Sequence, residues 1–296
     1  MKKLLTIVII ILLAGMSFAG EYFTVKDSYG NKVKIKKCPQ RIVSLNPSVT
    51  EILYSLGLDN KIVAVSNNCN YPVKAKNKPK IGDLSLNYER IISLKPDIVI
   101  AEGSIFKDTL DKLKSLNIPV FLVSCDNLKE FQSSFIILGK ALGKESKAKE
   151  LMNAFNYKLD KIKKRAVNIK DKPKVFVEIW NQPLMTASKG TFIDEIIQIS
   201  AGENIAKNLN NKYPVVNTEF LIKNNPDIII LTTNNPDDIY NNKVLKNINA
   251  VKNKKVYKIS PDIIARPTLR LAEAASQIYN WVCSYKPSCP GRILTR

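Results

Sequence analysis

Hydrophobic residues in the middle of the chain recur with the spacing of one long helix. Between Gly143 and Pro173 the apolar side chains mostly stand three or four residues apart, and lysine, glutamate and asparagine fill many of the other positions. This spacing places the apolar residues on one face of an α-helix. Because the stretch contains no glycine or proline before Pro173, it predicts a helix over 145–168, roughly 24 residues and about 36 Å long. Its apolar residues are Ala148, Leu151, Met152, Phe155, Leu159, Ile162 and Ala166.

Short runs of β-branched residues lie on both sides of this helix and alternate with helical segments. The predicted strands are 42–45, 63–65, 98–101, 120–123, 175–179, 228–231 and 256–259, and residues 20–37 are expected to form a hairpin. The predicted helices are 48–56, 88–94, 106–116, 131–142, 192–199 and 269–282. Ser48 and Glu51 have the spacing of a capping box at the first of these helices. Alternating strands and helices predict parallel sheets covered by helices.

Two stretches that lie 130 residues apart resemble each other. Residues 89–98 and 219–228 both begin with glutamate, place Pro-Asp before the last residue and run into a strand. The fold expected is therefore α/β, with two Rossmann-like lobes that have central parallel sheets and are joined by one long interlobe helix. The lobes are 20–143 and 170–296, and the helix is 144–169. Ligands of open α/β sheets bind beyond the carboxyl ends of the strands, so we expect a ligand cleft between the lobes.

The first nineteen residues have the pattern of a cleavable secretory signal peptide. Two lysines precede an apolar run from Leu4 to Ala14, and Ser17-Phe-Ala19 fits a cleavage site. An uncleaved anchor is the alternative. Export makes disulfides possible, and the Pro-containing tail makes Cys283 and Cys289 candidates for a pair. The chain has five cysteines, so at least one thiol is left over. A monomeric periplasmic protein is expected.

Charge and composition limit the classes of function. The formal net charge is +20, but the basic residues are scattered rather than gathered into a stripe, so nucleic acid is not expected as a partner. The chain contains no histidine. This excludes Ser-His-Asp and Cys-His catalysis and histidine-rich zinc sites. An enzyme is therefore not expected, and neither is a metal site, although carboxylate pairs remain an alternative.

Several motifs, in order, resemble the periplasmic substrate-binding proteins that serve ABC importers of cobalamin, ferric siderophores and haem. The motifs are Arg41-Ile-Val-Ser-Leu-Asn-Pro-Ser-Val-Thr-Glu51, Asn70-Tyr-Pro72, Lys80-Ile-Gly-Asp83, Asn87-Tyr-Glu-Arg-Ile91, Leu94-Lys-Pro-Asp97, Pro183-Leu-Met-Thr-Ala187 and Ala201-Gly-Glu-Asn204. The resemblance implies a binding component without chemistry and without a cofactor beyond its bound ligand. It implies that Glu89 and Glu219, one on each lobe, dock onto an inner-membrane ABC permease dimer with its ATPase. Glutamates that only favour a helix dipole are the alternative.

Within that family the chain is most similar to cobalamin binders, so the resemblance implies cobalamin or a related corrinoid as the ligand. A ferric siderophore or haem is the alternative. The implied ligand-binding residues are Asn68, Tyr71, Glu102, Trp180, Tyr213, Asp262 and Arg266. Aromatic walls with a few hydrogen-bonding groups suit a large flat ring. On the first lobe, the positions that are aromatic in cobalamin binders fall near Asn68, Asp83 or Leu84, and Glu102. Alternatives are a core position for Trp180, packing of Tyr71 beneath its own turn, and a surface pair of Arg266 with Asp262.

Overall fold

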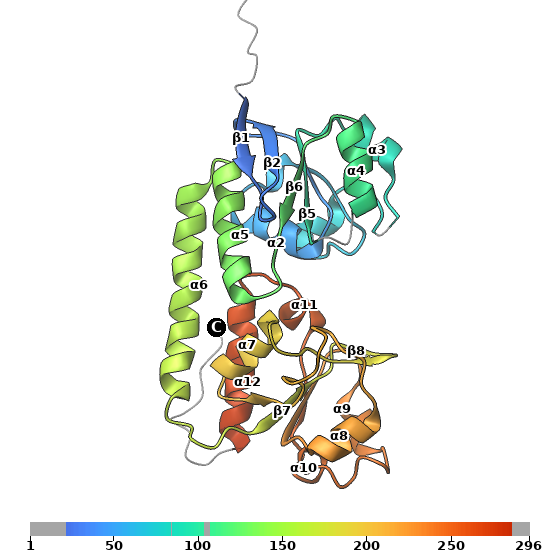
Figure 1. Ribbon diagram of the computed structural model, residues 1–296, viewed down its shortest axis with the longest axis vertical. Coiled ribbons are helices and arrows are strands. Elements are labelled where there is room, and N and C mark those ends of the chain that lie inside the picture. Colours follow the sequence, from blue (N-terminus) through green and yellow to red (C-terminus); the bar gives the residue numbers. More distant parts are fainter. Residues whose placement is uncertain (1–21, 84, 104–106, 286–296) are drawn as a thin grey trace, which may run out of the picture.

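The computed structural model describes residues 22–83, 85–103 and 107–285. Two lobes lie end to end along one long helix, α6 (Figure 1). The segment predicted to be a signal peptide, 1–19, and Cys289 lie outside the described residues. Cys283 is disulfide-bonded, and Cys38, Cys69 and Cys125 are free thiols. No helix in the described ranges is long and apolar enough to cross a membrane.

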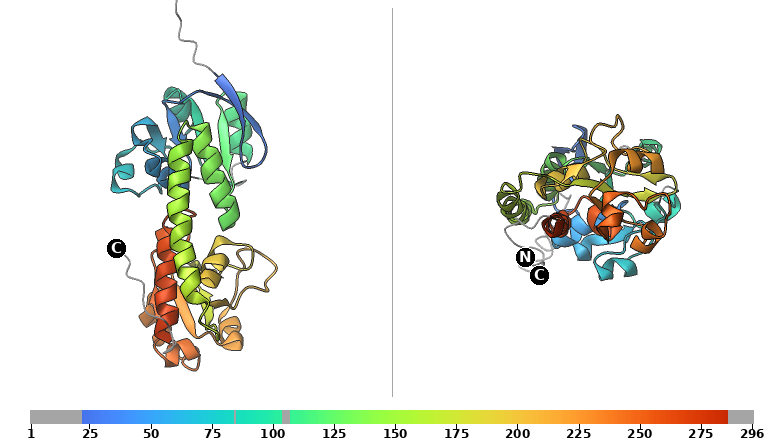
Figure 2. Two further views of the ribbon diagram at one scale, coloured as in Figure 1. Left: turned by 90° about the vertical axis from the view of Figure 1, so that its left-hand side faces the viewer. Right: turned by 90° about the horizontal axis from the view of Figure 1, so that it is seen from below.

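Helix α6 runs from Glu145 to Ala166, ending two residues before the predicted end. Its apolar face is buried as the spacing predicts, through Ala148, Met152, Phe155, Leu159, Ile162 and Ala166. Lysines and an arginine occupy its last turn, where cations interact favourably with the helix dipole. The helix packs against α5 (Leu128–Ala141), α7 (Phe192–Ile199) and α12 (Leu271–Tyr285). Because α5 belongs to one lobe and α7 and α12 to the other, α6 spans both lobes (Figure 2).

Each lobe contains a four-stranded parallel sheet. The first has the order β4-β3-β5-β6 and is formed by β3 (Ile42–Ser44), β4 (Ile62–Val65), β5 (Ile98–Glu102) and β6 (Val120–Val123). The second has the order β10-β7-β11-β12 and is formed by β7 (Lys174–Val177), β10 (Glu203–Asn204), β11 (Ile228–Leu231) and β12 (Val256–Lys258). Two antiparallel pairs complete the described strands: the predicted hairpin, β1 (Tyr22–Lys26) with β2 (Lys32–Lys36), and β8 (Trp180–Asn181) with β9 (Leu184–Met185). The two-lobed α/β architecture with parallel sheets is therefore confirmed.

The remaining helices are short. They are α2 (Pro47–Ser55), α3 (Tyr88–Ser93), α4 (Lys107–Ser115), α8 (Thr218–Asn224), α9 (Pro236–Tyr240), α10 (Asn249–Lys252) and α11 (Pro261–Ile264), with 3₁₀ turns at Asp59–Lys61 and Val73–Asn77. The predicted capping box at α2 is wrong. The helix begins at Pro47, its N-cap is Asn46, and no side chain caps it. Proline is well suited to the first helical position, because it lacks an N–H that would have no partner there.

The sequence repeat corresponds to the same local structure in both lobes. Asp97 precedes β5, and its carboxylate accepts a hydrogen bond from the backbone N–H of Arg41 at 3.1 Å. Asp227 precedes β11 and accepts one from the N–H of Lys174 at 2.9 Å. In each lobe the Pro-Asp aspartate thus joins the beginnings of two neighbouring strands. The repeat therefore corresponds to the same hydrogen bond between neighbouring strands in both lobes.

The two faces of each sheet pack into different cores. In β5, Ile98 and Ile100 join a cluster that runs through both lobes, whereas Val99 and Ala101 join a cluster confined to the N-terminal lobe. Strand β11 divides its residues between the shared cluster and a third cluster in the same alternating way. Successive strand side chains point to opposite faces, which accounts for the alternation. The shared cluster includes the buried faces of α5, α6, α7 and α12, so one apolar core joins the lobes.

Helices α5 and α6 approach each other closely at Gly139. A Cβ atom at this position would lie 2.4 Å from the Cβ of Ala148. We therefore expect Gly139→Ala to destabilise the protein by up to about 2 kcal/mol, because overpacking costs about 1–3 kcal/mol and the gain in helix propensity offsets about 1 kcal/mol of it. Urea unfolding measures this change.

The second substitution Ala148→Gly removes the opposing methyl group and serves as the control. The double variant should recover most of the stability lost by Gly139→Ala. If Gly139→Ala alone stabilises the protein, helix propensity outweighs the contact and the close approach does not limit the packing.

Candidate functional site

A cavity with a mixed polar and apolar lining lies where the two lobes face each other. Its volume is about 300 Å³, at the lower limit of the ~300–1,000 Å³ typical of ligand pockets. It is lined from the N-terminal lobe by Asn46, Pro47, Ser48 and Glu102, and from the C-terminal lobe by Pro261, Asp262, Ala265, Arg266 and Pro267. These residues follow β3, form the end of β5, and follow β12. The cavity therefore occupies the position beyond the strand ends where open α/β sheets bind ligands.

Glu102 is fixed at the N-terminal wall of this cavity by the turn after β3. Its backbone N–H donates to the side-chain oxygen of Asn46 at 2.7 Å, and its carboxyl group accepts a hydrogen bond from the hydroxyl of Ser48. Ser48 therefore positions a cleft residue and does not cap α2. Burial raises the pKa of Glu102 to about 7; the charge of Asp126 adds to this and the Ser48 hydroxyl opposes it. Part of the residue still reaches solvent through the cleft.

Arg266 forms the C-terminal wall and is bonded on several sides. It pairs with Asp262 at 2.6 Å, with Glu51 at 3.1 Å, and donates to the side-chain oxygen of Asn70 at 2.7 Å. Asn70 also donates to Asp262 at 2.9 Å. The pair of Arg266 with Asp262 considered from the sequence is present, but it belongs to a network that bridges the lobes. The side chain of Arg266 is 14% exposed, so Arg266 and Asp262 do not form an isolated surface pair.

The other predicted ligand residues lie at different depths around the cleft. Tyr213 is partly buried against the shared core, and burial together with the charges of Asp126 and Glu102 raises the pKa of its hydroxyl. Asn68 is exposed, and its carbonyl accepts a 3.5 Å hydrogen bond from Arg266. Tyr71 is 45% exposed, and the guanidinium of Arg270 lies 4.0 Å from the centre of its ring. None of the three lines the 300 Å³ cavity.

Trp180 is 53% exposed on β8, and its indole N–H donates to the carbonyl of Gln182 at 2.9 Å. A core position for this side chain is therefore wrong. Trp180 also lies outside the lining of the cavity. Glu51, Asn70 and Arg270 were missed as members of the interlobe network. A glutamate inside the apolar run Val49-Thr-Glu51-Ile-Leu53 was the available signal for Glu51, because a charge in such a run needs a partner.

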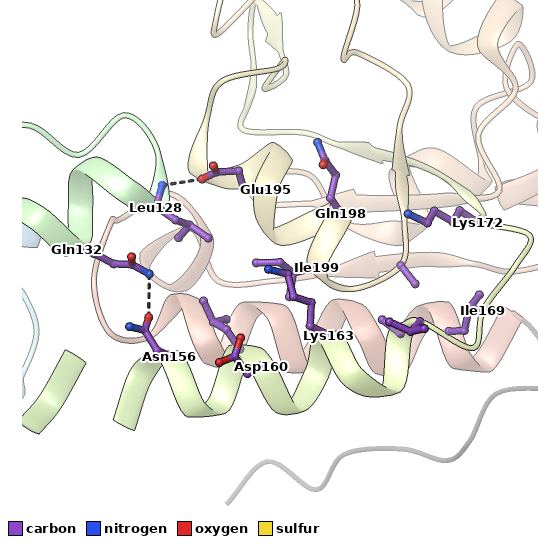
Figure 3. Close-up of a pocket in the computed structure, with 14 residues that line it drawn as sticks. Leu128, Gln132, Asn156, Asp160, Lys163, Ile169, Lys172, Glu195, Gln198 and Ile199 are labelled. Atoms are coloured by element: carbon purple, nitrogen blue, oxygen red, sulfur yellow. Dashed lines mark hydrogen bonds between the residues drawn. The ribbon is translucent and has the colours of Figure 1, made fainter. Parts of the chain in front are cut away.

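A larger groove of about 860 Å³ lies elsewhere, between α5, α6 and α7 (Figure 3). At one end the backbone N–H of Leu128 donates to Glu195 at 2.6 Å, and Gln132 donates to Asn156 at 2.8 Å. The lining of the groove includes buried apolar side chains such as Leu159 and side chains of both charges, such as Asp160 and Lys163. Helices and the segment after α6 line this groove, whereas open α/β sheets bind their ligands beyond the carboxyl ends of the strands. Size alone does not identify it as the ligand site.

Glu89 and Glu219 occupy equivalent places in the two lobes. Each is exposed in the first turn of a short helix, α3 or α8, whose N-cap is an asparagine two residues earlier. Each asparagine side chain accepts a hydrogen bond from the backbone N–H of the residue three positions later. The distance is 2.9 Å at Asn87 and 3.0 Å at Asn217. Both helices lie on parts of the lobes away from α6 (Figure 1).

The described residues contain no cluster of three or more side chains that could hold a metal ion.

The pKa of Glu102 predicts a pH-dependent stability. A folded-state pKa of about 7, above the ordinary 4.5, means that the folded protein holds this proton more tightly. The stability that this proton contributes to the folded state is fully present below about pH 4.5 and is lost as the pH rises through about 7. We therefore expect the free energy of unfolding, measured with urea, to fall between pH 5 and pH 8 in the wild type by more than it does in Glu102→Gln. The loss is at most about 3 kcal/mol, and smaller because solvent reaches the cleft. Parallel pH profiles would contradict a raised pKa.

Comparison with known proteins identifies the family of this chain. Residues 42–263 match the periplasmic binding protein family. An uncharacterized ABC transporter substrate-binding lipoprotein of Bacillus subtilis, YvrC, is 36% identical, with 86% of this chain and 83% of that protein covered. A vitamin B12-binding protein of Vibrio campbellii is 31% identical over 81% of this chain and 88% of that protein. The crystal structure of a possible iron-binding, periplasmic solute-binding protein from Staphylococcus epidermidis is 31% identical. It has a TM-score of 0.74 and covers 83% of this chain and 99% of that chain. The chain belongs to the periplasmic binding protein family.

Proposed function

We propose that this protein captures cobalamin or a related corrinoid in the cleft between its lobes and delivers it to an ABC permease. It works outside the cytoplasmic membrane and performs no chemistry on the ligand. The observation that carries the proposal is the cavity formed by strand-end turns of both lobes, because it provides hydrogen-bonding groups on two facing walls. The relative named as a vitamin B12-binding protein supports the choice of ligand.

The charges of the cavity favour a neutral ligand rich in hydrogen-bonding groups. Arg266 is the one cation among the lining residues, and it is already paired with Asp262 and Glu51. Glu102, with a pKa of about 7, is about half protonated at neutral pH. Such walls offer donors and acceptors to amide groups but no unpaired cation to an anionic ligand. Because about 300 Å³ is small for a corrin ring, the lobes separate when it enters.

A ferric siderophore is the second candidate, and haem is a further iron-containing alternative. The observation that favours an iron chelate is the 31% identity to the possible iron-binding protein of Staphylococcus epidermidis. The net charge of +20 also attracts anionic chelates over a distance. Opening of the lobes would release Arg266 from Glu51 and provide a cation for such a ligand.

The docking surface proposed for the permease includes Glu89 and Glu219. Their equivalent positions in a repeated lobe present two similar charges, which matches a permease built from two subunits. Neither residue lines the cavity, so docking and ligand binding use different side chains.

Ligand identity is tested by incubating the protein with cyanocobalamin, haemin or ferric siderophores and passing each mixture through a desalting column. We expect the corrinoid to elute with the protein at about one molecule per chain, because the chain has one cleft between two lobes. Absorbance of the protein fraction gives the ratio. Retention of an iron chelate alone would overturn the choice of corrinoid and leave the transport role in place.

Reversal of both docking charges should separate transport from binding. We expect Glu89→Arg with Glu219→Arg to abolish uptake of labelled ligand by cells that express the protein with its permease, while the ligand Kd stays within about twofold of wild type, well under 1 kcal/mol. Uptake and equilibrium titration measure the two effects.

The control is Glu150→Arg, which makes the charge change of one of the two substitutions at an exposed position on α6. Uptake should be retained in this variant. A loss of ligand affinity in the double variant would place the two glutamates in ligand binding instead of docking.

A further inference from the structure

Glu51 carries a buried charge on α2 whose partners come from the other lobe. Its side chain is 4% exposed, and its neighbours Val49, Ile52 and Leu53 belong to the shared core. One carboxylate oxygen accepts from Arg266 at 3.1 Å and from Arg270 at 2.5 Å, and the other accepts from Arg270 at 2.8 Å. Among the described residues, all hydrogen bonds and ion pairs of this carboxylate come from these two arginines. Each of its oxygens is therefore occupied from the C-terminal lobe.

A buried carboxylate without partners is costly, and removing one member of a buried ion pair typically costs several kcal/mol. When the lobes separate, Glu51 loses both arginines and must be hydrated or remain unpaired. The charge itself therefore opposes separation of the lobes. Another interlobe pair, Asp126 with Lys212 at 2.5 Å, differs in this respect, because both side chains are about half exposed. Water replaces such a partner readily, so an exposed pair contributes little.

The two arginines are also held by other groups of the N-terminal lobe. Arg270 stacks on the ring of Tyr71 and Arg266 donates to Asn70. Both arginines lie in the segment between α11 and α12, and Arg266 also lines the ligand cavity. Glu51 thus connects the interior of one lobe to a wall of the cleft supplied by the other.

We propose that Glu51 is a positioning residue of the ligand cleft: its carboxylate binds Arg266 and Arg270 across the lobe interface. It thereby keeps the lobes together and Arg266 in the cavity wall before the ligand arrives. This inference rests on the proposed function only where it concerns ligand affinity. The position of the lobes without ligand is a separate property and is measured separately.

The test is Glu51→Gln, which keeps the shape of the side chain and removes its charge. Spin labels at Lys76→Cys and Lys243→Cys, exposed positions on the two lobes, report the distance between the lobes once Cys38 is replaced by serine. Without ligand, the wild-type protein should give one narrow distance distribution. Glu51→Gln should give a broader distribution that extends to longer distances. Because the lobes separate to admit cyanocobalamin, a variant in which the separated form is about tenfold more populated should bind cyanocobalamin about tenfold more tightly.

Two further variants keep the test decisive. Asp126→Asn removes the exposed interlobe pair and should leave the distance distribution as in the wild type. Arg270→Gln should broaden the distribution less than Glu51→Gln, because Arg266 still reaches Glu51. Combining Arg270→Gln with Glu51→Gln should broaden it by less than the sum of the two single effects.

An unchanged distribution in Glu51→Gln and in Arg270→Gln overturns the proposal. Unchanged distances with a large loss of affinity also overturn it, because Glu51 would then act on the ligand directly. If Glu51→Gln does not fold, Arg270→Gln alone decides between broadening and no change. Failure to bind any corrinoid, with the distances changing as expected, contradicts the proposed ligand and leaves the role of Glu51 intact.

Discussion

Burial of one apolar face in each lobe against the same helices is the constraint on which the rest of the structure depends. Strands β5 and β11 place alternate residues in a single cluster that also contains the faces of α5, α6, α7 and α12. Separation of these helices would expose that face to water, at a free-energy cost of about 25 cal/mol for each Å² of apolar surface. The lobes are therefore attached along α6, and their strand ends are left facing each other across the cleft.

The interface beyond this core depends on charge. Glu51 places a carboxylate inside an apolar environment, and Arg266 and Arg270 satisfy it from the other lobe. Apolar packing joins the lobes without regard to their exact orientation, whereas hydrogen bonds to a carboxylate require defined distances and angles. The combination provides a firm attachment at the helices and a directional contact next to the cavity. A receptor of this kind can hold its cleft ready while still allowing the lobes to separate.

The sequence predicts the long helix, the two parallel sheets and the repeat because each is encoded by local spacing. The buried face of α6 is visible as apolar residues three and four positions apart, and the Pro-Asp repeat coincides with a shared strand pairing. The cleft is less predictable. Glu51 has the spacing of a capping box, and only the fold shows that its partners lie 215 and 219 positions later.

The solvent exposure of individual side chains could not be predicted from the sequence either. Trp180 follows a buried strand and could have been a core residue, yet it is 53% exposed because β8 extends from the lobe as part of a short hairpin. Glu102 was selected from a resemblance, and its wall position depends on hydrogen bonds from Ser48 and to Asn46, on a separate turn. Such contacts follow from the sheet order, in which β3 lies beside β5.

Hydrogen–deuterium exchange with and without saturating cyanocobalamin tests most directly whether the interlobe cleft is the ligand site. We expect slower exchange at the turns 46–48 and 261–267 and at the end of β5, because these backbone segments surround the cavity. The larger groove between α6 and α7 should exchange as in the free protein. Protection at 156–172 and 195–201 with no change at the turns would place the ligand in the groove and not in the interlobe cleft.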